Sequence, residues 1–401
     1  MKAQEDSVTA PTGRASAPAV TAGVLYDMLR RGEATTRSDL GRTSGLSRSA
    51  VTARVSALTE ANLLLESAGL ASTGGRPAGS LQLNPDAGIV LAVAIGRSRS
   101  QIGIFNLLGD PELSDSMDHK VGLEHTKLMP AVIKRLHAML ADDRRQVMAV
   151  GVSLPGTVDE RMGTSLDSAA LRSWAGVDVR EYFADLTTAP VFVGNDAAVL
   201  AQSELLDRTS RPHHALVLKA STGLSLGIID DGRVLRGSRG AAGDIGHTKH
   251  PDADGKLCRC GSYGCLEAVA AGWALVEQAG GADKGVGHIR DLVSLALAGD
   301  RAARSMIRES GRLVGESLAV AIDLLNPAAI VVGGDIAPAF EVYLAGMRES
   351  VYAGISAFAA TDLTFAPARF GESAGLVGCA ALALDNVLRP SAIDRLVANQ
   401  A

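Results

Sequence analysis

The arrangement of cysteine and histidine near the middle of the chain is the feature that most constrains its fold. Three of the four cysteines, Cys258, Cys260 and Cys265, fall within eight residues, and His247 precedes the first of them by eleven positions. Three thiolates and one imidazole are the ligand set of a closed, four-coordinate structural zinc site. The glycines between the cysteines let the backbone turn tightly around one ion. We therefore predict a structural Zn²⁺ bound by these four residues.

The alternative interpretation of this cluster is three free or buried thiols beside an unrelated loop. Disulfide pairing is disfavoured, because three clustered cysteines leave one unpaired and no sequence feature indicates an oxidising compartment. Four protein ligands leave no coordination position for water, so the predicted zinc is structural and not catalytic. The cluster indicates where the fold is held together and does not by itself indicate a function.

Length and composition exclude several classes of protein. A chain of 401 residues is long enough for two or three domains, and a hydrophobic content of 47% is enough to bury their cores. The net charge of −5 is not that of a polycation, so charge alone predicts no nucleic-acid partner. The sequence shows neither a signal peptide nor an apolar run of about 18 residues. We expect a cytoplasmic protein without membrane contact.

The N-terminal segment differs from the rest of the chain. Residues 1–19 are rich in Ala, Ser, Thr and Pro, which predicts a disordered arm. Residues 20–76 carry seven arginines against five acidic residues, whereas the rest of the chain is acidic. Helical spacing and capping residues predict a winged helix-turn-helix domain over 20–85. Its expected elements are a helix that stops at Gly32, a helix over 37–43, a helix from Ser47 to about Asn62, and wing strands over 63–66 and 81–83.

The third of these helices is the candidate DNA-binding element, because it enters the major groove in winged helix-turn-helix proteins. Its exposed face is small and polar, and Arg48 lies at its start, where a guanidinium can meet phosphate or guanine. We predict DNA contacts by Arg48, Ser49 and Thr52, and by Arg76 in the wing, since a narrow minor groove attracts arginine. The alternatives are a three-helix bundle with a solvated face, and a plain turn at residues 74–77.

From Ile89 onward, apolar runs alternate with helical stretches, and glycine-rich turns follow several of the runs. This pattern predicts an α/β body of about 300 residues with two lobes. The runs that predict strands lie at 89–95, 147–152, 190–193, 215–218, 226–229 and 329–332.

Three motifs in this body resemble the ROK family (repressors, open reading frames, kinases). They are Gly243-Asp-Ile-Gly-His247 leading into Cys258–Glu267, the pair Asn195-Asp196 after an apolar run, and the Pro155-Gly156 turn. The resemblance implies a two-lobed, actin-like (RNase H-like) sugar-kinase fold, with lobe 1 over 86–200 and lobe 2 over 201–401. It also implies that the zinc loop 247–265 lies in lobe 2 and that the C-terminal helix returns to lobe 1. The winged-helix segment matches the repressor branch of the family, because the family's kinases lack it.

The resemblance implies a sugar pocket between the lobes. Its residues would be Gly156, Asn195, Asp196, Asp244, His247 and Glu267. Carboxylates and an amide can bind vicinal hydroxyls, and a zinc-bound imidazole has a fixed orientation. The family usually has Glu at the position of Asp244, so one contact is shorter by a methylene and the sugar is not identified. The alternative for these acidic residues is a solvated rim or helix caps.

The two loops that would hold ATP phosphates depart from the family pattern. The first reads Asp-x-Gly-Gly-Thr in the family and Ala94-Ile-Gly-Arg-Ser98 here, and the second reads Gly-Thr-Gly-x-Gly-x-Gly in the family and Ser221-Thr-Gly-Leu-Ser-Leu-Gly227 here. An acidic residue and glycines that allow close approach to phosphate are lost. Asp196 could be the general base of a kinase, but these changes predict that the protein is not an enzyme.

These observations predict a sugar-responsive transcriptional repressor of carbohydrate metabolism genes. Its expected partners are a double-stranded DNA operator, a monosaccharide or sugar phosphate effector, and further copies of itself in a homodimer or homotetramer. Two alternatives stay open: an ATP-dependent, glucokinase-like sugar kinase with an added DNA-binding head, and a body that senses a protein partner.

Overall fold

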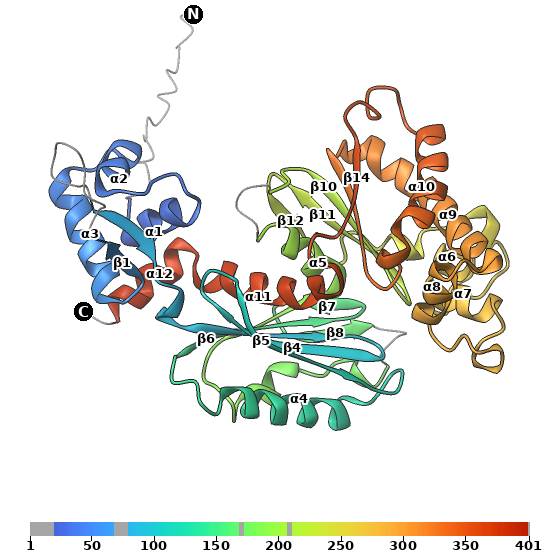
Figure 1. The fold of residues 1–401 in the computed structure, drawn as a ribbon, viewed down its shortest axis with the longest axis horizontal. Coiled ribbons are helices and arrows are strands. Elements are labelled where there is room, and N and C mark those ends of the chain that lie inside the picture. Colours follow the sequence, from blue (N-terminus) through green and yellow to red (C-terminus); the bar gives the residue numbers. More distant parts are fainter. Residues whose placement is uncertain (1–19, 68–78, 168–171, 207–210, 400–401) are drawn as a thin grey trace, which may run out of the picture. The chain divides into compact units, whose positions relative to one another are not determined.

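The computed structural model describes residues 20–67, 79–167, 172–206 and 211–399 (Figure 1). The chain forms two compact units. One contains the residues up to Leu83 together with 389–401, and the other contains Asn84–Leu388. The chain therefore contributes to the first unit at both of its ends.

The first unit has the helices and the wing strands that the sequence predicted. Each helix begins at a side-chain cap, because Thr21, Thr36 and Ser47 accept hydrogen bonds from backbone N–H groups of the first turn. Gly45 ends the second helix with φ 72°, a left-handed conformation that favours glycine. The elements are α1 (Ala22–Arg30), α2 (Arg37–Ser44), α3 (Arg48–Glu60), β1 (Leu64–Ser67) and β2 (Ser80–Leu83), with β1 and β2 antiparallel.

The last helix, α12 (Pro390–Ala398), corrects one expected boundary. We expected lobe 2 to span 201–401 with a C-terminal helix that returns to lobe 1, but residues 389–401 belong to the first unit, where α12 packs against α1 (Figure 1). The Asp394 carboxylate accepts a hydrogen bond from the Gly23 N–H at 2.7 Å. A Cβ at Gly23 would lie 2.0 Å from the carbonyl oxygen of Pro390, so the close approach of the two backbones requires glycine there.

The second unit contains two five-stranded sheets with the same strand pattern. The orders are β5-β4-β3-β6-β9 and β12-β11-β10-β13-β14. In each sheet the first three strands along the chain are antiparallel neighbours, and two later strands join in parallel. This repeat divides the unit into two similar lobes, which is the actin-like architecture that the resemblance implied.

The six apolar runs of the sequence all form strands, with ends within three residues of those expected. The strands of lobe 1 are β3 (Ile89–Ile95), β4 (Arg99–Asn106), β5 (Pro111–Asp118), β6 (Val147–Leu154) and β9 (Val191–Asn195). A separate hairpin is formed by β7 (Thr157–Asp159) and β8 (Thr164–Asp167). The strands of lobe 2 are β10 (Ala215–Ala220), β11 (Leu224–Asp230), β12 (Arg233–Leu235), β13 (Ala329–Gly333) and β14 (Thr364–Pro367).

Helices cover these sheets and connect the lobes. Helix α11 packs on β3 and β6 of lobe 1 and on α5, and a Cβ at Gly151 would lie 1.9 Å from the carbonyl oxygen of Cys379. Backbone therefore meets backbone where α11 crosses β6. The helices are α4 (His125–Leu140), α5 (Asp196–Glu204), α6 (Glu267–Ala270), α7 (Gly272–Gln278), α8 (Ile289–Leu297), α9 (Arg301–Leu325), α10 (Phe340–Gly354) and α11 (Ala374–Val387).

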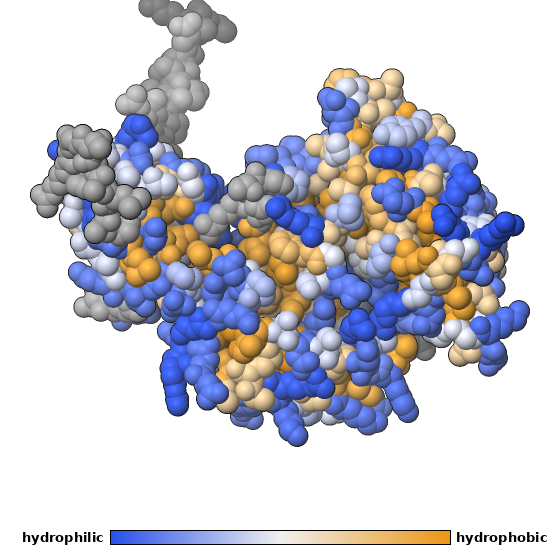
Figure 2. Space-filling view, in the orientation of Figure 1, coloured by the Kyte–Doolittle hydropathy of each residue, from blue (hydrophilic) through white to orange (hydrophobic). Residues whose placement is uncertain are grey.

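The surface of the second unit is mixed in character. Large apolar side chains are exposed on α9, at Val320 and Leu324, and after α10, at Phe358. The surface over the chain segment that follows α10 is accordingly apolar at the upper right of Figure 2. Within the described ranges, no single helix has both the length and the apolar character needed to span a membrane, although one bent pair, 371–387 with 390–398, meets these criteria on length and composition alone.

Candidate functional site

A cleft of ≈ 640 Å³ lies in the second unit at the ends of β3, β6, β9 and β10, so both lobes contribute to its walls. This volume is within the range of about 300–1,000 Å³ that small-molecule sites occupy. The cleft is lined by all six residues of the expected sugar pocket: Gly156, Asn195, Asp196, Asp244, His247 and Glu267.

Asn195 positions one wall of the cleft. It follows β9 and caps α5, because its Oδ1 accepts hydrogen bonds from the N–H groups of Ala197 and Ala198 at 2.9 and 3.2 Å. Its Nδ2 donates to the Gly156 carbonyl at 2.6 Å, and Gly156 has φ 83°. Asn195 thus joins the start of α5 to the turn after β6, and these bonds fix where Asp196 enters the cleft.

Asp196 has a partner that the sequence analysis missed. Its carboxylate forms an ion pair with the Lys219 ammonium on β10 at 2.8 Å. Burial alone would lower the pKa of Lys219, but the charge and hydrogen bond of Asp196, together with the more distant Asp335, outweigh burial and raise that pKa. One oxygen of the candidate base is therefore engaged by a fixed cation. A single Lys in the apolar run 215–220 is the sequence signal that could have indicated it.

Glu267 connects the cleft to residues 221–227, the second of the two loops at the positions that bind ATP phosphates in the family. We call these two segments, 94–98 and 221–227, the first and second phosphate-type loops. One carboxylate oxygen accepts the Leu224 N–H at 2.7 Å, and the other accepts the Trp273 indole N–H at 3.3 Å. A Cβ at Gly223 would lie 2.7 Å from the first of these oxygens. Glu267 is thus held by the loop before β11 and by α7, and it leaves only its remaining lone pairs for a ligand.

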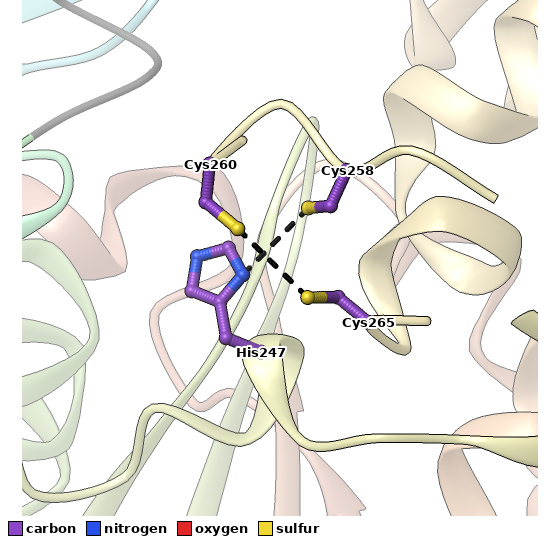
Figure 3. A group of neighbouring side chains, drawn as sticks. All are labelled: His247, Cys258, Cys260 and Cys265. Atoms are coloured by element: carbon purple, nitrogen blue, oxygen red, sulfur yellow. Dashed lines mark hydrogen bonds between the residues drawn. The ribbon is translucent and has the colours of Figure 1, made fainter. Parts of the chain in front are cut away.

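The predicted zinc ligands lie together (Figure 3). The donor atoms of His247, Cys258, Cys260 and Cys265 all lie within 4.8 Å of one another. His247 Nδ1 is 3.7 Å from Cys258 Sγ, and Cys260 Sγ is 3.8 Å from Cys265 Sγ. With a Zn–S bond of about 2.3 Å, the sulfur–sulfur edge of a tetrahedron is about 3.8 Å, so this donor set fits a four-coordinate zinc ion.

The two ring nitrogens of His247 face different groups. Its Nδ1 points to the thiols, whereas its Nε2 lies 4.0 Å from an Asp244 oxygen at the cleft. A ligand histidine commonly directs its second nitrogen to a carboxylate, which fixes the ring. The fourth cysteine lies elsewhere: Cys379 is buried on α11, and this burial raises the pKa of its thiol to about 12.

The first phosphate-type loop, residues 94–98, contains Arg97 where the family has glycine. Burial of the side chain lowers the pKa of Arg97, the nearby Arg259 lowers it further, and Glu267 opposes both. The Nε of Arg97 is buried and has no hydrogen-bond partner among the residues that the structure describes. In the second loop, the Ser221 hydroxyl, which also replaces a glycine, accepts the Asp335 N–H at 3.0 Å.

Polar side chains join the two loops across the cleft. His288 Nδ1 accepts the Arg290 N–H at 3.2 Å as the cap of α8, so its proton lies on Nε2. That Nε2 is 3.2 Å from the Ser98 hydroxyl of lobe 1 and 3.4 Å from the Thr222 hydroxyl of lobe 2. Arg290 adds bonds of 3.4 Å to Ser98 and to Asp335. These bonds connect lobe 1 to lobe 2 at the mouth of the cleft.

The candidate DNA-contacting residues lie on α3 in the first unit. Val51, Val55 and Leu58 are buried, whereas Arg48, Ser49 and Thr52 are exposed. Thr52 uses its hydroxyl to donate to the Arg48 carbonyl at 2.9 Å, and the Ser49 hydroxyl lies 3.1 Å from that of Ser47. The face is polar, with Arg48 at its start and small hydroxyl side chains beyond it. Arg76 lies outside the described residues.

Comparisons with known proteins agree with this architecture. The chain is 24% identical over 359 residues to a xylose repressor of Bacillus spizizenii, which covers 88% of this chain and 91% of that protein. It is 28% identical over 349 residues to the DNA-binding transcriptional dual regulator NagC of Escherichia coli, with 83% and 84% covered.

Solved structures divide into regulators and kinases. A ROK family transcriptional regulator described as a homologue of the E. coli MLC protein superposes with a TM-score of 0.78, is 27% identical, and matches over 94% of this chain and 98% of its own. A ROK family glucokinase from Streptomyces griseus, in complex with glucose and AMPPNP, has a TM-score of 0.62 and 27% identity over 73% of this chain and 98% of its own. The ROK family profile matches residues 90–386. The chain therefore belongs to the ROK family.

Proposed function

We propose that this protein is a sugar-responsive, DNA-binding transcriptional repressor of carbohydrate metabolism genes. The observation that carries the proposal is a winged-helix unit with an exposed polar helix, α3, in the same chain as a ROK body with a polar cleft. The similarity to a xylose repressor, to a DNA-binding transcriptional dual regulator and to a ROK family transcriptional regulator supports it. The cytoplasm is the compartment that such a regulator requires.

The α3 helix is the part that reads DNA in this proposal. Its N-terminus enters the major groove, where Arg48 binds phosphate or guanine and the small side chains of Ser49 and Thr52 let the helix approach the bases. Arg76 in the wing contacts the neighbouring minor groove. A homodimer presents two such heads and a homotetramer four, and the exposed Val320, Leu324 and Phe358 support self-association of the second unit.

The cleft is the part that binds the effector. Asp244, Glu267 and Asp196 accept hydrogen bonds from sugar hydroxyls, while Asn195 holds the Gly156 turn at the pocket edge. Ligand can change operator affinity only by binding one lobe arrangement better than the other. Residues His247, Cys258, Cys260 and Cys265 would hold a structural zinc ion, which orients the imidazole beside Asp244.

The effector site lacks kinase function in this proposal. Arg97 and Ser221 replace glycines at which phosphate needs close approach of the backbone. The Lys219 ammonium also occupies an oxygen of Asp196, which in a kinase would accept the proton of the attacking hydroxyl.

The DNA-binding part is tested by the affinity of the full-length protein for operator DNA. We expect Arg48→Ala to weaken binding to operator DNA by about 1–3 kcal/mol, roughly 5- to 150-fold, because a bidentate guanidinium contact is lost. Arg395→Ala is the matched control, since Arg395 is an exposed arginine of the same unit on α12. Fluorescence anisotropy with a labelled operator fragment measures both. Equal affinity of Arg48→Ala and wild type would refute α3 as the recognition helix.

A sugar kinase with an added DNA-binding head is the second candidate, and the Asn195-Asp196 pair favours it. Coupled assays of ADP release over hexoses, pentoses and amino sugars decide between the two. We expect no sugar-dependent ADP release. Turnover that Asp196→Asn abolishes would instead establish the kinase, because that variant removes the base and keeps the shape of the side chain.

A further inference from the structure

Two arginines line the cleft but are not among the residues of the proposed sugar pocket. Arg97 lies in the loop between β3 and β4, and Arg259 lies between two of the candidate zinc ligands, Cys258 and Cys260. Among the described residues, neither has a carboxylate oxygen within the 4 Å of an ion pair, although other cleft cations do: Lys219 pairs with Asp196, and Arg290 pairs with Asp335.

Arg97 is the less satisfied of the two. Its Nε is buried and has no hydrogen-bond partner in the described part of the chain, and the pKa of its side chain is lowered by burial and by the positive charge of Arg259. An arginine keeps its proton in spite of such a shift, so a positive charge stays in a place where the protein provides no close counter-charge. A partly buried charge of this kind is costly unless another group compensates it.

The guanidinium of Arg259 packs on an aromatic ring. Its guanidinium lies 4.5 Å from the centre of the Trp273 ring, and the indole N–H of Trp273 donates to Glu267. Stacking on an indole fixes the plane of the guanidinium and leaves its N–H groups free to bind in that plane. Glu267 lies near both arginines, but its oxygens already accept hydrogen bonds from Leu224 and Trp273.

We propose that Arg97 and Arg259 form an oxyanion subsite that binds a phosphate group beside the sugar pocket, so that the ligand of the cleft is a phosphorylated one. Two guanidinium groups suit a phosphate monoester, because each can donate two parallel hydrogen bonds to its oxygens. The subsite lies at the first phosphate-type loop but uses side chains where that loop in the family uses glycine backbone. The inference rests on the proposed sensing role of the cleft, since it names the chemical class of the effector.

Calorimetric titration of the full-length protein in phosphate-free buffer tests the subsite. The probes are inorganic phosphate, glucose 6-phosphate, glucose 1-phosphate, AMP and glucose. We expect inorganic phosphate to bind wild type, and Arg97→Gln and Arg259→Gln each to weaken that binding at least about tenfold, the effect of losing a charge-assisted hydrogen bond. Arg97→Lys should retain part of the affinity. Arg308→Gln, which changes an exposed arginine on α9 outside the cleft, should bind as wild type does.

The other probes identify the source of the phosphate. Tighter binding of a sugar phosphate than of inorganic phosphate or AMP, lost in Arg97→Gln, supports a phosphorylated sugar as effector. Wild-type phosphate affinity in both Gln variants, with their thermal transitions intact, would overturn the subsite. Operator release by a neutral sugar, equal in wild type and Arg97→Gln, would overturn the phosphorylated effector and leave the sugar sensor standing. Arg97-dependent phosphate binding with no effect of any sugar or sugar phosphate on operator binding would have the opposite meaning: the subsite stands and the sugar sensor fails.

Discussion

At the scale of single residues, the ion pair between Asp196 and Lys219 sets the surroundings of the candidate base in this cleft. A carboxylate that must accept a proton needs a free oxygen near the attacking hydroxyl. Here one oxygen of Asp196 is bound by an ammonium whose pKa is raised despite burial. The pair is mostly buried, with 14% of the Asp196 side chain and 28% of the Lys219 side chain exposed, so each charge depends on the other.

Removal of one charge of this pair should therefore destabilise the second unit. We expect Lys219→Met to lower the stability by about 1–3 kcal/mol, because the carboxylate is left without its partner. The double variant Lys219→Met with Asp196→Asn should be more stable than Lys219→Met alone, since no unpaired charge is then left. Differential scanning calorimetry of the full chain measures the transition of each variant. A double variant less stable than both single variants would show that the ion pair is not what holds these side chains.

The residues that could be predicted from sequence are those whose chemistry is local. Cys258, Cys260 and Cys265 lie within eight positions and few structures other than a metal site use such a cluster, so their proximity followed from spacing. Lys219 and Asp196 are 23 positions apart, and they meet only because β10 lies beside the start of α5. The lone Lys in the apolar run 215–220 marks an unusual residue but does not indicate its partner, and no local pattern places Arg97 and Arg259 in one cleft.

At the scale of elements, α12 shows why the boundary of a unit is harder to predict than the element itself. An apolar face on a helix indicates that a partner covers it, but not which partner. The observed partner is α1, and the contact depends on Gly23, where α1 and the start of α12 approach closely. The edge strand β5 was missed for a related reason, since its side chains are mostly exposed and polar and it lacks the apolar pattern of the central strands.

Substitution of Gly23 tests the packing of α12. We expect Gly23→Ala to destabilise the first unit by about 1–3 kcal/mol, because the added methyl would lie 2.0 Å from the Pro390 carbonyl oxygen. Gly41→Ala on α2 is the control: its added methyl meets nothing closer than 3.6 Å, so better helix propensity should make it neutral or stabilising. Hydrogen exchange of peptides from 22–30 and 390–398 reports the effect. Unchanged protection of both peptides in Gly23→Ala would contradict the docking of α12.

The loop over 247–265 contains little regular secondary structure, and in the proposed function it is stabilised by the binding of zinc to four of its side chains. We expect one zinc ion per chain, lost from Cys260→Ser and retained in Cys379→Ala, because only the first variant removes a ligand. Metal analysis after dialysis gives the stoichiometry, and the thermal transition of the second unit should fall when a chelator removes the ion. Equal zinc content in Cys260→Ser and wild type would exclude the proposed ligand set.

At the scale of the whole molecule, the repeated strand pattern gives two lobes that line a shared cleft. The lobes are joined at the cleft mouth by the bonds of His288 and Arg290 to Ser98. A ligand that favours one arrangement must outweigh or reinforce these bonds, so they form part of the free-energy difference between liganded and unliganded states. The fold class and the lobes followed from the apolar runs and the family motifs, but these cross-lobe contacts depend on side chains from three separate loops.

The pH dependence of the second unit should report the state of His288. Burial lowers the pKa of His288, Asp335 and Asp291 act in the opposite direction, and Arg290 and Arg97 lower it further. The folded protein therefore binds this proton less readily than the unfolded chain, and stability is lost as the pH falls below the ordinary histidine value of about 6.5. Protonation of Nδ1 would also remove the acceptor of the Arg290 N–H and end the cap of α8.

We expect the thermal transition of wild type to fall more between pH 7.5 and pH 5.5 than that of His288→Asn. Asparagine is a good helix cap that does not titrate, so the variant keeps the cap and loses the proton-binding step, together with the Nε2 contacts to Ser98 and Thr222. Calorimetry at a series of pH values gives both slopes, and Asn386→His on α11, a partly buried position outside the cleft, is the control for an added histidine. If the slopes of wild type and His288→Asn coincide, protonation of His288 does not contribute to the loss of stability at low pH.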